Sequence, residues 1–135
     1  MIEVQVRLKE DVQFEIAARQ HTLVSDQPIE AGGQDAGMTP PELFLSALGS
    51  CAAFYASAYL KKKGLLRAGV EVRVTAEKAG PPARLDHFLI EVKIPIELSE
   101  ADRAGLDRSV HHCLIHNTML HRPSIEIELQ TPVAA

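Results

Sequence analysis

The chain has 135 residues, of which 46% are hydrophobic and 24% are charged, and its formal net charge at pH 7 is −4. This composition fits one globular domain over residues 1–135, although a domain of this size leaves much surface exposed and benefits from a partner subunit. The negative charge argues against nucleic acid as the main partner, because nucleic-acid-binding proteins usually carry a basic stripe. The first residues alternate polar and apolar and lack the order of a secretion signal, so we expect a cytoplasmic protein.

Three strands are predicted at the start of the chain. Apolar residues alternate with polar ones over Ile2–Leu8, over Phe14–Ala18 and around Leu23, which is the period of a half-buried strand. The glycine-containing segment 31–38 that follows is typical of an irregular loop. The pattern therefore predicts a three-stranded meander and then a loop.

A long helix is predicted next. Thr39, Pro40 and Glu42 fit a capping box at its start, and Gly64 is a stop signal after about Lys63. Residues 43–60 form an uncharged stretch of 18 residues, which is the threshold length for a membrane span. Because serines, glycine and alanines make it only mildly apolar, we expect no membrane span but a central helix buried in a dimer.

The second half of the chain returns to strand periodicity. A hairpin is predicted from Val70–Ala76 and Phe88–Ile96, and Pro95 indicates an edge or bulge near its end. A second helix is predicted from the Ser99 cap to about Asn117, followed by a last strand over Ile125–Leu129. The order βββ-α-ββ-α-β predicts an α+β domain with two buried helices against antiparallel sheets.

Two cysteines are the first candidates for chemistry. Cys51 lies in the middle of the uncharged helix, and Cys113 lies in a histidine-rich run that also contains His112 and His116. The pair is compatible with a structural disulfide, two buried core residues or a redox couple, and a reducing cytosol disfavours the first. Residues His112, Cys113 and His116 share a helix face, but the usual zinc spacings are missing, so we expect neither a metal nor a cofactor.

Three segments resemble the OsmC/Ohr family of osmotically inducible and organic-hydroperoxide-resistance proteins, and its OsmC-like branch in particular. They are Gly37–Cys51, His112–His116 and Ile125–Leu129. The resemblance implies an intertwined homodimer in which two central helices pack together and the sheets wrap around them. It also implies a thiol peroxidase in which Cys51 attacks the peroxide and becomes a sulfenic acid, and Cys113 resolves it to a disulfide.

A cation is expected near Cys51, because only a thiolate is a good nucleophile and this cysteine lies 12 residues past the Thr39 cap, too far for the helix dipole. The hydroperoxide-resistance branch implies an arginine from the N-terminal strands, for which Arg19 is the candidate, held by a glutamate. That branch places the glutamate ten residues before the cysteine, where this chain has Pro41. Glu42 is the nearest candidate, although its capping box explains it without catalysis.

Two functions remain open at this stage. The first is reduction of organic hydroperoxides, with an unidentified dithiol as reductant and a substrate pocket formed by Leu48, Phe54, Tyr55 and His116. The second is a non-catalytic dimeric protein that binds a small hydrophobic molecule at the subunit interface. The paired cysteine motifs favour the peroxidase. The chain nevertheless looks closer to the less characterised OsmC-like branch than to the dedicated hydroperoxide reductases, and Leu114, which replaces a proline common in the family, is a further departure from the pattern.

Overall fold

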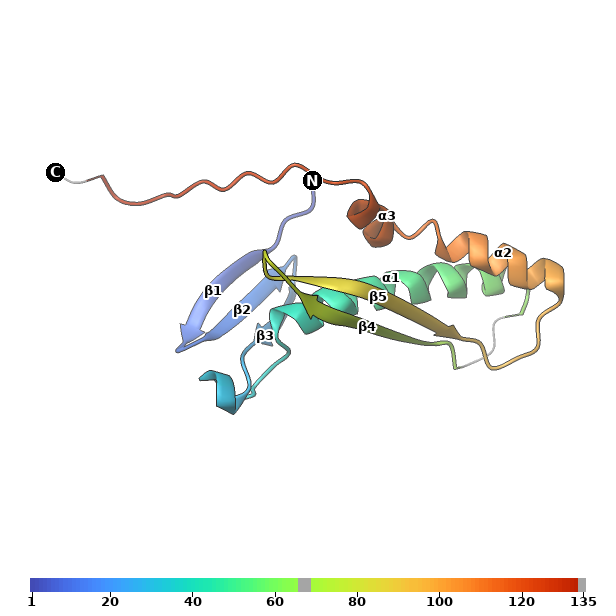
Figure 1. Cartoon of the computed structure of the whole chain (residues 1–135), viewed down its shortest axis with the longest axis horizontal. Coiled ribbons are helices and arrows are strands. Elements are labelled where there is room, and N and C mark those ends of the chain that lie inside the picture. Colours follow the sequence, from blue (N-terminus) through green and yellow to red (C-terminus); the bar gives the residue numbers. More distant parts are fainter. Residues whose placement is uncertain (66–68, 134–135) are drawn as a thin grey trace.

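The computed structural model describes residues 1–65 and 69–133 and places one long helix at the centre of the chain (Figure 1). The first sheet is an antiparallel meander of β1 (Gln5–Glu10), β2 (Gln13–Ala18) and β3 (His21–Ser25), in that order. In its register Val6 pairs with Ile16, which in turn pairs with Leu23. Apolar side chains therefore line one face of this sheet, and all of β1 is exposed in the single chain.

The central helix α1 (Pro40–Lys62) begins and ends as predicted. Thr39 and Glu42 form the capping box, and Gly64 has the positive φ of a helix stop. By length and composition α1 could cross a membrane, but the core helix of a soluble protein meets the same criterion. One stripe of α1 is fully buried, at four-residue spacing, and consists of Leu48, Ala52, Ala56 and Leu60.

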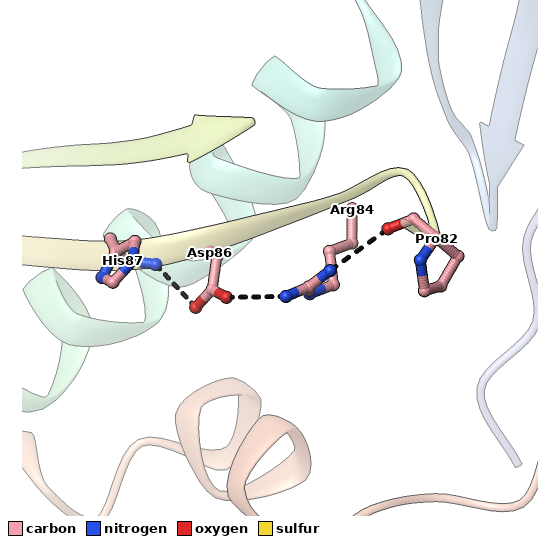
Figure 2. Close-up of polar contacts among 4 residues, drawn as sticks. All are labelled: Pro82, Arg84, Asp86 and His87. Carbon is pink, nitrogen blue, oxygen red and sulfur yellow. Dashed lines mark hydrogen bonds and ion pairs between the residues drawn. The ribbon is translucent and has the colours of Figure 1, made fainter. Parts of the chain in front are cut away.

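The second sheet is the hairpin of β4 (Glu71–Ala79) and β5 (Arg84–Lys93), which packs along α1. Its register shifts between Thr75 and Glu77, opposite His87, which has a positive φ of 51°. Figure 2 shows the polar contacts at this bulge: Asp86 accepts from the His87 amide at 2.9 Å and pairs with Arg84 at 3.3 Å. The predicted second strand extended to Ile96, and it ends earlier because Pro95 has no N–H for the ladder.

The single second helix predicted from the sequence is two helices. Ser99 caps α2 (Glu100–Val110) as expected, but the chain then turns at His111 and His112. Cys113 has a non-helical ψ of 120° and begins a separate helix, α3 (Leu114–Leu120). The correction matters for the site, because Cys113 lies between two helices and not within one.

The α+β class is confirmed and the order of the elements fits the prediction as far as the second helix, but the expected last strand has no pairing partner. Residues 121–133 carry no regular structure and run away from the helices as an extended trace (Figure 1). The alternating apolar residues of this segment are among the most exposed in the chain, with Ile127 at 86%. A strand requires a neighbour for its backbone hydrogen bonds, and within the described residues this segment has none.

The chain exposes far more surface than a globular monomer of its mass. Its accessible surface is 10865 Å², whereas a folded monomer of this mass exposes about 7,000 Å². The apolar face of β1 and the C-terminal segment account for many of the exposed large apolar side chains. One chain therefore covers its core incompletely.

Candidate redox site

Helix α1 presents Cys51 from its middle. The neighbouring Leu48 and Ala52 are fully buried, and Cys51 itself is half-buried. The capping box fixes the start of this helix: the Thr39 amide donates to Glu42 Oε2 at 3.0 Å, and the Glu42 amide donates to Thr39 Oγ1 at 3.5 Å. A continuous helix with a buried stripe gives the Cys51 side chain a fixed position.

The second thiol reaches Cys51 from the junction of α2 and α3. Both helices pack on α1, and the Ser109 hydroxyl donates to the Tyr55 carbonyl at 3.0 Å, which ties the end of α2 to α1 one turn beyond Cys51. Cys113 is 1% exposed, and it lies close enough to Cys51 for that side chain to raise the pKa of the Cys113 thiol. The structure thus brings together two free thiols that lie 62 residues apart in the sequence.

The electrostatics of Cys113 favour its neutral form. Burial raises the pKa of the Cys113 thiol, and the adjacent Cys51 side chain raises it further through a hydrogen bond and through charge. The backbone N–H groups of His116 and Ile115 act in the opposite direction, and the His116 amide lies 3.5 Å from Cys113 Sγ. Cys113 is therefore a shielded thiol whose accessible neighbour is Cys51.

Two thiols in this arrangement can exchange electrons with an oxidant. If the more exposed Cys51 is oxidised to a sulfenic acid, Cys113 is already close enough to condense with it to a disulfide. Because Cys51 is more exposed than Cys113, a solute reaches Cys51 first.

The structure does not bring the two predicted electrostatic partners to the cysteines. Arg19 lies in the exposed two-residue turn between β2 and β3, with a positive φ of 56°. In the described part of the chain, no hydrogen bond or ion pair joins Arg19 to either cysteine. The Glu42 carboxylate is occupied by the capping box. The roles of Arg19 and Glu42 at Cys51 therefore stay predictions.

The residues predicted to form one substrate pocket lie in different places. Leu48 is part of the buried stripe, whereas Phe54 is 66% exposed and packs edge-on against Tyr55 at a centroid distance of 5.4 Å. His116 lines a groove of about 970 Å³ between β5 and α2, whose apolar wall includes Ile90, Val92 and Ile94.

Sequence reasoning missed other residues around this groove. The α2 side of the groove carries Arg103, Asp107 and His111, and the His111 ring lies 5.9 Å from that of His116. The three-to-four-residue spacing along α2 was the available signal, because such residues share a helix face. Within residues 1–65 and 69–133, no group of three or more histidine, cysteine, aspartate or glutamate side chains is arranged to hold a metal ion.

Comparison with known proteins gives a family match. The model of the family described as OsmC-like protein matches residues 32–128. No curated protein matches the sequence.

Several solved structures are similar in fold. An OsmC-like protein from Mycoplasma pneumoniae is 21% identical, with a TM-score of 0.73 and coverage of 90% of this chain and 89% of that chain. A Psychrobacter arcticus protein assigned to osmotic stress induction and detoxification is 19% identical, with a TM-score of 0.78 and coverages of 87% and 88%. The organic hydroperoxide resistance protein OsmC from Legionella pneumophila is 14% identical, with a TM-score of 0.60 and coverages of 90% and 90%. At these identities the similarity establishes the fold.

Proposed function

The chain belongs to the OsmC-like protein family, and we propose that it is a cysteine-based thiol peroxidase that reduces organic hydroperoxides in defence against oxidative stress. The observation that carries the proposal is the proximity of the half-buried Cys51 and the buried Cys113, both of them free thiols. Family membership and the description of the Legionella neighbour as an organic hydroperoxide resistance and redox protein support a stress-related redox role.

The proposed reaction uses each thiol once. The Cys51 thiolate attacks the terminal peroxide oxygen, the O–O bond breaks, and the products are the Cys51 sulfenic acid and an alcohol. The Cys113 sulfur then attacks the sulfenic sulfur, which releases water and forms the Cys51–Cys113 disulfide. An external dithiol, which we place in the cytoplasm, reduces this disulfide and is itself oxidised. The cycle needs neither a metal nor another cofactor.

We also propose that the active form is a homodimer. One chain exposes roughly half as much surface again as expected for its mass, and much of it is apolar. A second copy would cover the apolar face of β1 and supply a pairing partner for residues 121–133. The same assembly would allow Arg19 of one chain to approach a cysteine of the other.

The alternative function is binding of a small hydrophobic molecule without catalysis. The groove between β5 and α2 favours it, because an apolar wall faces a polar helix edge across a volume suited to a small ligand. In this alternative the two thiols are packing residues, and peroxide leaves them reduced.

The test is stopped-flow consumption of cumene hydroperoxide and hydrogen peroxide with a dithiol reductant. We expect rapid turnover that prefers the organic peroxide, no turnover by Cys51→Ser, and loss of two thiols per chain when the reductant is omitted. Equally slow reaction of wild type and Cys51→Ser would reject the peroxidase and direct attention to the groove.

A further inference from the structure

The side chain of Cys113 caps the start of helix α3. This residue is the N-cap of the helix, and its Sγ accepts from the backbone N–H of His116 at 3.5 Å. Serine, threonine, aspartate and asparagine usually perform this role, and a cap satisfies one of the amides that the first helical turn leaves unpaired. The candidate resolving thiol is therefore also a structural element of the helix that follows it.

Helix α3 is held by few buried contacts. Of its seven residues four are half-buried and none is fully buried, and Leu114 and Leu120 are 60% and 66% exposed. The Asn117 side chain also donates to the His111 carbonyl at 3.4 Å. The main packing partner of α3 is α1. A helix of this length is marginal without tertiary contacts, so its first turn depends strongly on the cap.

We propose that formation of the Cys51–Cys113 disulfide withdraws the cap from α3 and opens this helix, so that the oxidation state of the site controls the order of residues 114–120. The inference rests on the proposed redox chemistry but not on the identity of the oxidant. Two thiols lose two electrons and two protons to an organic hydroperoxide, which becomes an alcohol and water, and a dithiol returns them.

Helix α1 is more deeply buried than α3, and this difference determines which of the two cysteines moves when the disulfide forms. Both cysteines are free, and a disulfide would bring their sulfurs to about 2.05 Å with a defined torsion angle, closer than two unbonded sulfur atoms can lie. Cys51 lies between the fully buried Leu48 and Ala52 in the middle of α1, so it stays in place. Cys113 must therefore adjust to α1, and its Sγ is no longer positioned by the first turn of α3.

Hydrogen exchange of residues 114–120 tests the inference, with Cys113→Ser and Cys113→Ala as a matched pair. Neither variant can form the disulfide, but serine retains a capping oxygen and alanine does not. In the wild type the disulfide is formed with diamide, which oxidises neighbouring thiols without a peroxide step, and thiol counting verifies it.

We expect exchange in α3 to be about fivefold faster in reduced Cys113→Ala than in reduced wild type, the effect of a lost N-cap, and at least as fast in oxidised wild type. Cys113→Ser should behave as reduced wild type with and without diamide. Residues 52–60 of α1 should exchange equally in all samples, which excludes general unfolding.

Unchanged protection of α3 in wild type with a verified disulfide would overturn the inference, as would failure of diamide to link the two thiols. If α3 opens on diamide treatment but the protein does not consume peroxide, the inference stands and the proposed peroxidase function is rejected.

Discussion

The two cysteines occupy regions of opposite character. Cys51 lies in the middle of a 23-residue helix that has a capping box at its start and a fully buried stripe along its length. Cys113 lies in a turn between α2 and the short, exposed α3, which an unpaired segment follows. In the proposed reaction this difference corresponds to two roles, in which Cys51 in the long helix reacts with the solute and Cys113 at the turn resolves the product.

Replacement of Cys113 is expected to have the largest effect that separates the two proposed roles. Cys113→Ser should form the Cys51 sulfenic acid at nearly the wild-type rate, because Cys51 and its helix are unchanged. Without a resolving thiol, steady-state turnover with a dithiol should fall by about a hundredfold or more. Single-turnover and steady-state stopped-flow experiments measure the two rates separately.

The control for this prediction is Cys51→Ser, which should abolish both rates. If Cys113→Ser loses the rate of Cys51 oxidation as fully as Cys51→Ser does, then Cys113 also activates Cys51. The proposed division of roles would then be incorrect.

The difference in burial predicts unequal effects on stability. Leu48→Ala removes a fully buried side chain from α1 and should lower the free energy of unfolding by about 3 kcal/mol. Leu114→Ala removes an exposed side chain from α3 and should change it by about 0.5 kcal/mol or less. Urea unfolding at one fixed protein concentration measures both, and similar losses would mean that a partner subunit covers α3.

The same contrast explains how much was predictable from the sequence. The elements around Cys51 follow from local signals, because the Thr39–Glu42 capping box and the period-two strands act over a few residues. The break before α3 was missed because cysteine is not a usual N-cap, so the run around Cys113 reads as a continuous helix. The proximity of the two thiols was implied by the family resemblance and not by their spacing.

Two further features depend on more than local sequence. The strand expected at Ile125–Leu129 has the correct alternation, but pairing requires an edge that one chain does not provide. Asp26 escaped notice altogether: it is fully buried and accepts from the amides of Gln27, Gln34 and Ala36 at 2.8, 3.1 and 3.0 Å. The path of the loop over residues 27–36 brings these amides to the Asp26 carboxylate, and no short sequence motif marks the arrangement.

Asp26 predicts that the stability of the region around Cys51 depends on pH, because the loop that contains Asp26 leads into α1. Burial alone raises the pKa of this carboxyl group, but the hydrogen bonds from Ala36, Gln27, Gln34 and Gln13 outweigh it, so the pKa is held below its usual value. A lowered folded-state pKa contributes stability that is present above the unfolded pKa of about 4 and is lost as the pH falls through the folded value.

Asp26→Asn should therefore be less stable than wild type at pH 7. The difference in the free energy of unfolding between the two proteins should decrease as the pH falls below about 4. Urea unfolding from pH 7 to pH 3 measures this difference, with Asp35→Asn as the control because Asp35 is exposed. If the difference in the free energy of unfolding does not change with pH, the effect of the substitution comes from packing and not from the charge of Asp26.

The smallest expected effect tests whether the start of α1 stabilises the helix without activating its thiol. Thr39→Ala removes the capping hydroxyl and should lower the free energy of unfolding by about 1 kcal/mol, whereas Thr39→Ser should retain most of it. Both variants should oxidise Cys51 at the wild-type rate, because the field of a helix terminus fades within its first turn and Cys51 lies 12 residues away. A slower single-turnover oxidation in Thr39→Ala alone would show that the capping box also positions Cys51. If both variants keep the wild-type rate, the groups that activate this thiol must be sought away from the helix start.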